Sequence, residues 1–263
     1  MPKKPAWAIE KDRARKPGQA SASDRFWLFG LHAVRDALCN HDRVKHRLIV
    51  TKNASDRLAP EILATGMTPE ISDPRRFSAP IDTQSVHQGV ALEVEPLDWG
   101  SVSERCAPGT SNPLVLALDR VTDPHNVGAI LRSAEVFGAC AVVAPYRHSS
   151  PETGALAKAA SGALERQPYL RVPNLARAMG ALHDMGYYVL GLDGSGEITL
   201  EEGVKFGAEQ PLVLVLGSEG EGLRQLTRSL CDEIVQIPAS SAFGSLNVSN
   251  AAAVALYAAR GRH

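Results

Sequence analysis

The stretch LVLALDRVTDPHNVGAILR (114–132) passes from a continuous apolar run through a polar loop into a helical pattern. A run such as LVLALD is typical of a strand that is covered on both faces of a parallel sheet. The residues that follow, 126–139, have the apolar spacing of a helix. This stretch therefore predicts a strand, a polar loop and a helix at the start of an α/β unit.

The same alternation continues to the end of the chain. Further apolar runs predict strands at 140–145, 169–172, 187–193, 211–217 and 233–238. Helical patterns lie between and after these runs, at 153–165, 174–186, 223–230 and 247–259. Regular alternation of strands and helices favours a parallel sheet with helices on both faces. The expected fold class is therefore α/β, with this sheet formed by residues 113–263.

The first 112 residues divide into three segments by composition. Residues 1–25 carry seven basic and three acidic side chains and few large apolar groups, a pattern that predicts a flexible basic tail. Residues 26–97 predict a small α/β unit, with a helix at 26–38, a strand at 47–51, a helix at 57–66 and a strand at 89–97. Residues 98–112 are rich in Gly, Ser and Pro and predict a linker.

The composition excludes several classes of protein. The 263 residues are 44% hydrophobic and 22% charged, with a formal net charge of −1, which is typical of soluble globular proteins. No apolar window is long enough to span a bilayer, and the N-terminus lacks the apolar stretch of a secretory signal. The four cysteines are scattered without a C-x-x-C pair, which argues against a zinc site or a disulfide framework. We expect a cytoplasmic protein without a bound metal and without a membrane partner.

Three polar stretches follow expected strands, at 119–132, 217–223 and 237–250. In an open parallel sheet, ligands bind outside the carboxyl ends of the strands. The G-x-G-x-x-G fingerprint, the Walker A loop and the G-x-S-x-G elbow are all absent from these stretches. Glu219 and Glu221 would repel a pyrophosphate. The loops therefore suit a ligand without phosphate that is neutral or cationic near them, and S-adenosylmethionine is a compatible candidate.

Each polar residue in these stretches also has a purely structural explanation. Ser245 or Asn247 could cap the final helix, and Asn126 could cap the helix that begins near it. Arg132 could lie on a solvated helix face, and Glu219 could be a solvated loop carboxylate. From the residues alone, the structural explanation and a role in ligand binding or catalysis both stay open for each of them.

Taken together, DPHNVGAILRSAEVFGA (123–139), LVLGSEGEGL (214–223) and IPASSAFGSLNVSNAAAVALY (237–257) resemble the three successive motifs of the SPOUT-class RNA 2′-O-ribose methyltransferases, in their TrmH-like branch. Upstream, FGLHAVRDAL (29–38) and VHQGV (86–90) resemble the substrate-binding domain that precedes the catalytic domain in the large-subunit rRNA guanosine methyltransferases of this family. The resemblance covers the chain from residue 26 to its end.

The resemblance implies a trefoil-knotted, homodimeric methyltransferase domain at 113–263 that binds S-adenosylmethionine, and an RNA substrate-binding domain at 26–97. Matching positions imply a set of donor-binding residues, namely Leu216, Gly217, Ile237, Pro238, Ser245, Leu246 and Asn247. They also imply a catalytic set, namely Asn126, Arg132, Glu219, Ser245 and Asn247. Arg132 would act either as a base on the ribose hydroxyl or as a phosphate clamp. The high pKa of arginine favours the clamp.

The resulting interpretation is S-adenosylmethionine-dependent 2′-O-methylation of a ribose in RNA, with a guanosine of large-subunit rRNA as the expected target. Transfer RNA is the alternative substrate, because the catalytic motifs barely distinguish the two. A noncatalytic RNA-binding member of the same fold is a further alternative, which the joint presence of the catalytic set disfavours. The missing glycine fingerprint disfavours a dinucleotide-binding oxidoreductase.

Overall fold

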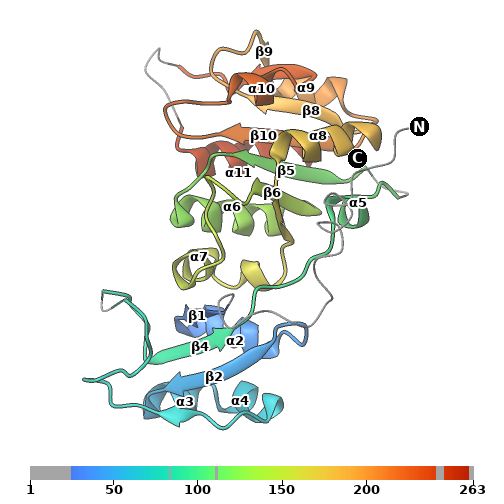
Figure 1. Ribbon diagram of the computed structural model, residues 1–263. Coiled ribbons are helices and arrows are strands. Elements are labelled where there is room, and N and C mark those ends of the chain that lie inside the picture. Colours follow the sequence, from blue (N-terminus) through green and yellow to red (C-terminus); the bar gives the residue numbers. More distant parts are fainter. Residues whose placement is uncertain (1–24, 83, 110–111, 241–245, 261–263) are drawn as a thin grey trace, which may run out of the picture.

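A computed structural model describes residues 25–82, 84–109, 112–240 and 246–260 of the chain. Two sheets organise these residues, a four-stranded sheet near the N-terminus and a seven-stranded sheet in the rest of the chain (Figure 1). The expected basic tail at 1–25 lies, except for Arg25, outside the described residues. Within the described part, no helix has the length and apolar character needed to cross a membrane.

The N-terminal sheet has the strand order β1-β4-β2-β3. Its central strand β4 is antiparallel to both of its neighbours, and β2 is parallel to β3. Its strands are β1 (Phe26–Phe29), β2 (Lys45–Val50), β3 (Glu70–Ile71) and β4 (Val90–Val94). The helices that accompany them are α2 (Leu31–Cys39), α3 (Lys52–Arg57) and α4 (Ala59–Thr65).

The single helix expected at 26–38 is wrong in its first part. Phe26–Phe29 is a strand that pairs antiparallel with β4, in the register Phe26 to Val94 and Phe29 to Ala91. Gly30 follows with a φ of 90°, a left-handed conformation that glycine adopts without strain, and α2 begins at Leu31. The pairing with a strand more than 60 residues away therefore overrides the local helical pattern.

The large sheet has the strand order β7-β6-β5-β10-β8-β11-β9, and every pair of neighbouring strands is parallel. This confirms the expected α/β fold class. Its strands are β5 (Leu114–Asp119), β6 (Ala141–Pro145), β7 (Tyr169–Val172), β8 (Tyr188–Leu192), β9 (Ile198–Thr199), β10 (Leu212–Gly217) and β11 (Glu233–Gln236). Its helices are α6 (Pro124–Val136), α7 (Gly154–Ala160), α8 (Leu175–Asp184), α9 (Leu200–Phe206), α10 (Gln225–Arg228) and α11 (Val248–Ala259).

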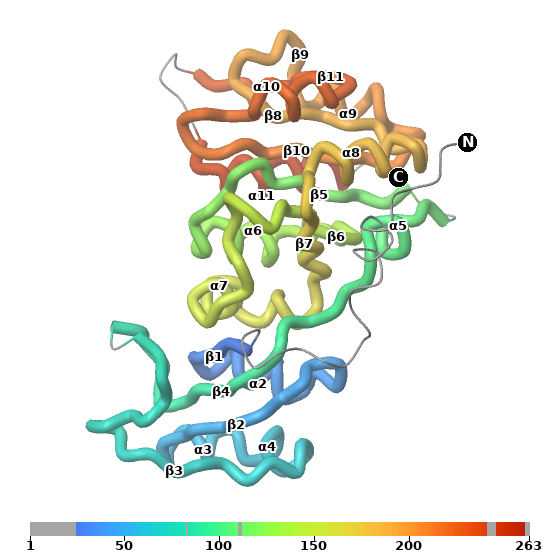
Figure 2. The backbone as a smooth tube through the Cα atoms, in the orientation of Figure 1, coloured from blue at the N-terminus to red at the C-terminus, as the bar shows by residue number. Residues whose placement is uncertain are grey.

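Strand β5, in the interior of the sheet, is buried along its whole length and supplies both faces of the core. Leu116 and Leu118 belong to the cluster that includes α6 and α11, whereas Val115 and Ala117 belong to the cluster that includes α8. Successive side chains of a strand point to opposite faces, so one apolar run fills two core layers. Figure 2 shows the resulting layers, with α11 beside α6.

The structure differs from the expected elements at five further places. Helix α3 (Lys52–Arg57) precedes the single helix expected at 57–66 and was not expected. The linker contains a short helix, α5 (Val102–Arg105), that begins with a capping box. Strand β9 and helix α9 were not expected at all, and the helix at 223–230 is shorter than expected. The helix expected at 153–165 is broken after Ala160, because Ser161 and Gly162 have left-handed backbones (φ of 50° and 91°).

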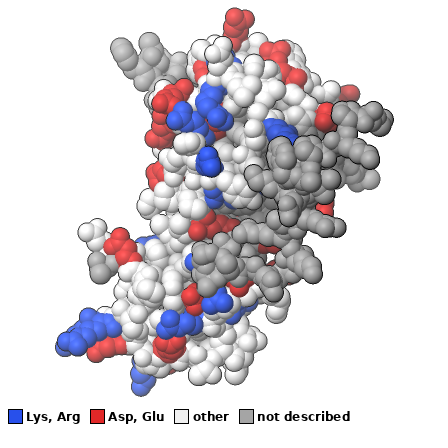
Figure 3. Space-filling view, in the orientation of Figure 1, with Lys and Arg blue, Asp and Glu red and all other residues white. Residues whose placement is uncertain are grey.

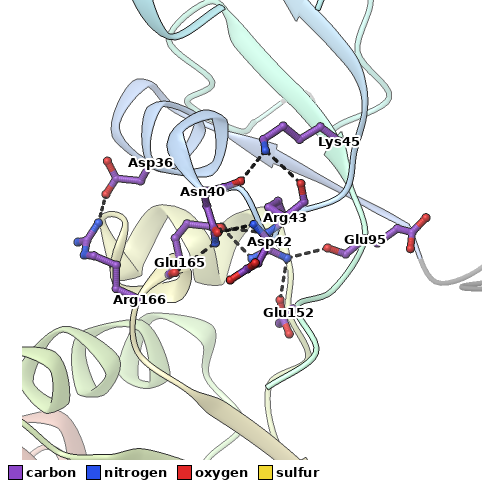
Figure 4. Close-up of polar contacts among 9 residues, drawn as sticks. All are labelled: Asp36, Asn40, Asp42, Arg43, Lys45, Glu95, Glu152, Glu165 and Arg166. Atoms are coloured by element: carbon purple, nitrogen blue, oxygen red, sulfur yellow. Dashed lines mark hydrogen bonds and ion pairs between the residues drawn. The ribbon is translucent and has the colours of Figure 1, made fainter. Parts of the chain in front are cut away.

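An ion network joins the two sheet units (Figure 4). Arg43 lies between α2 and β2, and its side chain is fully buried. Its Nη2 and Nε donate to the two carboxylate oxygens of Glu165, at 2.7 and 3.0 Å. Its Nη1 donates to the backbone carbonyl of Glu95 at 2.7 Å and lies 3.3 Å from the carboxylate of Glu152. Asn40 completes the network by donating to Glu165 at 2.9 Å.

The close approach of α7 to β1 fixes the same interface. A side chain at Gly154, the first residue of α7, would overlap the backbone carbonyl of Trp27 and the ring of Phe29. On the exposed side of the interface, Arg166 forms ion pairs with Asp36 and Glu135. These contacts hold the N-terminal sheet against the α7 side of the large unit (Figure 1).

We expect Arg43→Ala to lower the free energy of unfolding by about 3–5 kcal/mol, because the substitution leaves two buried carboxylates without their cation. Urea denaturation followed by circular dichroism measures this loss. Arg47→Ala is the matched control, since Arg47 pairs with Glu70 at the surface of the same unit. An equal loss in both variants would contradict the stabilising role of the buried network.

Burial raises the pKa of Glu152, and the nearby charge of Arg43 only partly offsets this effect. As the pH rises from the ordinary value of 4.5 through the raised pKa, the folded wild type must bury a second carboxylate charge and loses stability. We therefore expect Glu152→Gln to unfold at higher urea concentration than wild type, with a difference that grows across this window and then levels off. Urea unfolding of both proteins over a pH series measures the difference. A difference that is constant or shrinks with rising pH would refute the prediction.

Candidate active site

A cavity of about 750 Å³ opens at the carboxyl ends of β8, β10 and β11, beside the start of α11. This volume is in the range of pockets that hold cofactors and other small ligands. Its walls combine apolar side chains with the glycine-rich loop that follows β10. The lining residues include Leu192, Asp193, Leu216, Gly217, Glu219, Glu221, Val235, Ile237, Pro238, Leu246 and Val248.

The structure places five of the residues expected to bind the donor in the wall of this cavity, namely Leu216, Gly217, Ile237, Pro238 and Leu246. Leu246 is half exposed, so one side of its chain faces open solvent. Asn247 follows directly in the chain and contacts the loop that forms the opposite wall. Ser245 lies outside the described residues, so its position stays a prediction.

The loop after β10 folds back so closely that the last residue of this strand must be glycine. Ser218 and Gly222 form an antiparallel bridge, and the Gly222 N–H donates to the Ser218 carbonyl at 3.0 Å. A side chain at Gly217 would overlap the backbone of Gly222. Gly220 and Gly222 have positive φ values, 84° and 66°. The tight turn presents Glu219 at its tip.

The carboxylate oxygen Oε1 of Glu219 collects donors from two distant helix starts. The side-chain amide of Asn126, in the first turn of α6, donates to it at 3.2 Å. The side-chain amide of Asn247 donates at 2.5 Å, and the Val248 backbone N–H donates at 3.4 Å. The Asn247 amide also lies 3.0 Å from Oδ1 of Asn126. The structure therefore brings together three of the expected catalytic residues, Asn126, Glu219 and Asn247.

Asn247 caps a helix and also takes part in the Glu219 cluster, so its capping role does not exclude a role in the site. Its Oδ1 caps α11 by accepting from the backbone N–H of Ser249 at 2.9 Å, while its Nδ2 belongs to the Glu219 cluster. Asn126 has no capping role, because Asp123 caps α6 by accepting from the N–H of His125. The side chain of Asn126 is thus committed to Glu219 and Asn247.

The structure does not bring Arg132 into this cluster. Arg132 lies six residues after Asn126 on α6, about 9 Å further along the helix axis and on another side of it. Its side chain is exposed, and it forms no hydrogen bond or ion pair with any residue that the structure describes. Within the described part of the chain, its charge is therefore not neutralised by a carboxylate.

Two contacts that sequence reasoning missed hold the cavity loops in place. The carboxylate of Asp119 is fully buried at the end of β5 and accepts from Nε of Arg224 at 2.7 Å and from its backbone N–H at 3.2 Å. A carboxylate that ends a strand buried on both faces needs such a partner, which is the signal that could have identified it. This pair ties the far end of the glycine loop to β5.

The cavity wall is acidic, and this favours a ligand with positive charge. Burial alone would raise the pKa of Asp193, but hydrogen bonds from the Ser195 hydroxyl and backbone N–H and the charge of Arg228 outweigh it. The net effect lowers the pKa of Asp193, so that it stays ionised. Glu219 and Glu221 line the same cavity, and no Lys or Arg belongs to the described part of its lining. Cationic sulfonium and ammonium groups fit this wall, whereas phosphate does not.

Two family models match most of the chain. The model described as the SpoU rRNA Methylase family matches residues 113–257. The model described as RNA 2′-O ribose methyltransferase substrate binding matches residues 27–99. Among the described residues, no group of three or more His, Cys, Asp or Glu side chains could hold a metal ion.

Curated relatives and solved structures agree with these models. The chain is 37% identical over 242 residues to the 23S rRNA (guanosine-2′-O-)-methyltransferase RlmB of Photobacterium profundum, covering 88% of this chain and 96% of that protein. It is 39% identical over 237 residues to RlmB of Ralstonia nicotianae, covering 88% and 94%.

The SpoU methyltransferase AviRb from Streptomyces viridochromogenes, solved in complex with the cofactor AdoMet, superposes with a TM-score of 0.76. Its sequence is 26% identical, and the match covers 90% of each chain. The resemblance inferred from the sequence is confirmed, and so are the activity and the S-adenosylmethionine cofactor expected from it. The chain belongs to the SpoU methyltransferase family and is an S-adenosylmethionine-dependent RNA 2′-O-ribose methyltransferase.

Proposed function

We propose that the protein methylates the ribose 2′-hydroxyl of a guanosine in 23S rRNA. The observation that carries this proposal is the cluster of Asn126, Glu219 and Asn247 at the edge of the donor cavity. The printed activity of the RlmB relatives supports the choice of 23S rRNA and of guanosine.

In the proposed reaction, bound S-adenosylmethionine supplies a methyl group that is activated by its sulfonium. The residues of the cavity wall hold the donor, with Leu216, Ile237 and Leu246 against its apolar parts and Asp193 near its positive charge. Ser245, Pro238 and the backbone of Gly217 complete this proposed donor site. The ribose oxygen would gain the methyl group as the bond between sulfur and the methyl carbon breaks, S-adenosylhomocysteine would leave, and the hydroxyl proton would pass to solvent.

Glu219 is the proposed contact for the reacting hydroxyl. Its Oε1 is occupied by the two asparagines and by Val248, whereas Oε2 accepts no hydrogen bond from any described residue. Because the carboxylate is held from one side, Oε2 points in a fixed direction and can accept a hydrogen bond from an incoming hydroxyl. Positioning of this kind supplies much of the rate in reactions that need little covalent help from the protein.

Arg132 is the proposed clamp for a substrate phosphate. An arginine remains protonated at ordinary pH, so it suits charge stabilisation better than proton removal. Its exposure and its lack of a partner among the described residues support this role.

In this proposal, the two sheet units have different roles in RNA binding and methyl transfer. Residues 26–97 bind the RNA, residues 98–112 connect the units, and residues 113–263 transfer the methyl group. The model matched by residues 27–99 supports the first assignment, since its description names substrate binding. We assign the tail at 1–25 to nonspecific contact with RNA phosphates because of its positive charge.

We further propose that the protein is a cytoplasmic homodimer with a trefoil knot around its last helix. Exposed apolar side chains on two adjacent helices support self-association, namely Val136 on α6 and Val254 and Tyr257 on α11. The packing of α11 against α6, α9 and β10, next to the cavity loops, supports the knot.

The expected substrate is tested by methyl transfer from labelled S-adenosylmethionine to three RNAs: 23S rRNA, 16S rRNA and bulk tRNA, each from cells that lack the protein. We expect incorporation into 23S rRNA, and mapping of the alkali-resistant linkage should place the methyl group on one guanosine. Arg132→Ala should lower the rate about a hundredfold while donor affinity stays unchanged. Incorporation into tRNA alone would overturn the choice of rRNA, and absence of incorporation into every RNA would overturn the proposed function.

A further inference from the structure

On the face shown in Figure 3, basic and acidic side chains of the described residues are intermixed. The distribution of charge on this face therefore does not indicate where RNA would bind. Specific contacts must therefore guide the substrate on that face. One loop outside the donor cavity has the features of such a contact. Three consecutive exposed residues, Tyr146, Arg147 and His148, stand between buried Pro145 and buried Ser149.

Arg171 of β7 holds the base of this loop from beneath. Its guanidinium donates to the backbone carbonyls of Tyr146 at 2.7 Å, Ser150 at 3.1 Å and Pro145 at 3.4 Å. It also lies 5.7 Å from the ring centroid of Tyr146 and 5.8 Å from that of Tyr169. The hydroxyl of Tyr169 donates to the carbonyl of Ser150 at 2.8 Å. The loop is therefore held in one shape before any ligand arrives.

The backbone at the tip of the loop is strained. His148 has a φ of 60°, a left-handed conformation that costs free energy for a residue with a side chain. Its imidazole forms no hydrogen bond or ion pair with the described residues, so no contact within the described chain explains its presence. Arg147 likewise has no carboxylate partner among them, since nearby Glu152 is buried against Arg43. The loop thus displays an aromatic ring, a free cation and an imidazole to solvent.

The position of the loop connects the donor cavity with the substrate-binding unit. It follows β6, which is separated from β10 and its cavity only by β5, or about 10 Å at the usual strand spacing. On its other side the chain enters α7, whose first residue packs against β1 (Figure 2). The loop therefore lies between the strand next to β5 and the helix that contacts the N-terminal sheet, on a direct route from that sheet to the cavity.

We propose that Tyr146, Arg147 and His148 bind an unpaired nucleotide of the substrate RNA next to the methylated one. The ring of Tyr146 stacks on the base, with the imidazole of His148 beside it, and the guanidinium of Arg147 pairs with the adjoining phosphate. Stacking on aromatic side chains and phosphate pairing are the usual means of holding single-stranded RNA. This assignment deepens the proposed function and rests on it, because it presumes an RNA substrate.

Three variants of the full-length protein test this site: Tyr146→Leu, Arg147→Gln and His148→Asn. Leucine keeps an apolar side chain, glutamine removes only charge, and asparagine tolerates the left-handed backbone of position 148. Arg177→Gln is the matched control, because Arg177 is an exposed arginine on α8. Binding is measured by fluorescence anisotropy with a labelled single-stranded RNA of mixed sequence, which does not depend on methyl transfer.

We expect Tyr146→Leu to weaken RNA binding roughly tenfold or more, with a smaller loss for His148→Asn. Arg147→Gln should make the salt dependence of binding shallower by about 0.7 in the logarithmic slope, as expected for one lost phosphate contact. In methyl transfer, the half-saturating RNA concentration should rise, while donor affinity and the maximal single-turnover rate stay unchanged. Arg177→Gln should match wild type, and all variants should keep the wild-type melting temperature.

Unchanged RNA affinity in Tyr146→Leu and Arg147→Gln would overturn the site, even if wild type methylates RNA normally. A lower maximal rate with unchanged RNA affinity would also overturn it, because that result would place the loop in the chemical step. If wild type binds RNA through this loop but methylates no RNA, the site stands and the proposed methylation fails.

Discussion

A single carboxylate oxygen, Oε1 of Glu219, holds together segments that lie 93 residues before it and 28 residues after it in the chain. Hydrogen bonds to a charged acceptor are about twice as strong as neutral ones, and the three donors here come from two helix starts. The same glycine loop that carries Glu219 also forms one wall of the donor cavity, and the residues before α11 form another. The shape of the cavity therefore depends on this carboxylate.

A second constraint fixes the two sheet units against each other. Arg43 and Glu165 are 122 residues apart and both buried, so the N-terminal sheet is fixed against the large unit rather than loosely tethered to it. Removing these two charges from water costs free energy of solvation. The bidentate contact between the two side chains and the other hydrogen bonds of Arg43 offset this cost. The result is a fixed orientation, because the N-terminal unit is held on the α7 side of the large unit.

The sequence predicted the large sheet well and the small unit less well, for a physical reason. Strands β5, β6 and β10 of the parallel sheet are buried on both faces, so their continuous apolar runs are visible without knowledge of their neighbours. Phe26–Phe29 forms a strand only because β4 pairs with it, and the short strand β9 has two residues and a weak local pattern. The buried partners Asp119–Arg224 and Arg43–Glu165 are likewise set by distant contacts that local pattern does not encode.

The residues of the candidate site were likewise predicted only in part. The motif resemblance pointed to Asn126, Glu219 and Asn247, and the structure brings these three together. At Asn247 the structure shows that capping and contact with Glu219 are compatible, because the two ends of one amide make the two contacts. Arg132 stays a proposal, since its position on α6 is away from the cluster.

The central claim is that the Asn247 amide acts through Glu219 and not only as a helix cap, and Asn247→Asp separates the two roles. The aspartate keeps the oxygen that caps α11 but replaces the donor that faces Oε1 of Glu219 at 2.5 Å. Asn174→Asp is the matched control, because Asn174 caps α8 in the same way by accepting from the Arg177 N–H.

The deciding measurement is single-turnover methyl transfer at saturating S-adenosylmethionine and RNA, alongside a melting curve. The account predicts a rate loss on the order of a hundredfold for Asn247→Asp and wild-type transfer in the control. The melting temperature of Asn247→Asp should fall, because two carboxylates then face each other, but a cooperative transition should show that the variant still folds. Undiminished transfer by Asn247→Asp would contradict the account and leave Asn247 as a helix cap alone.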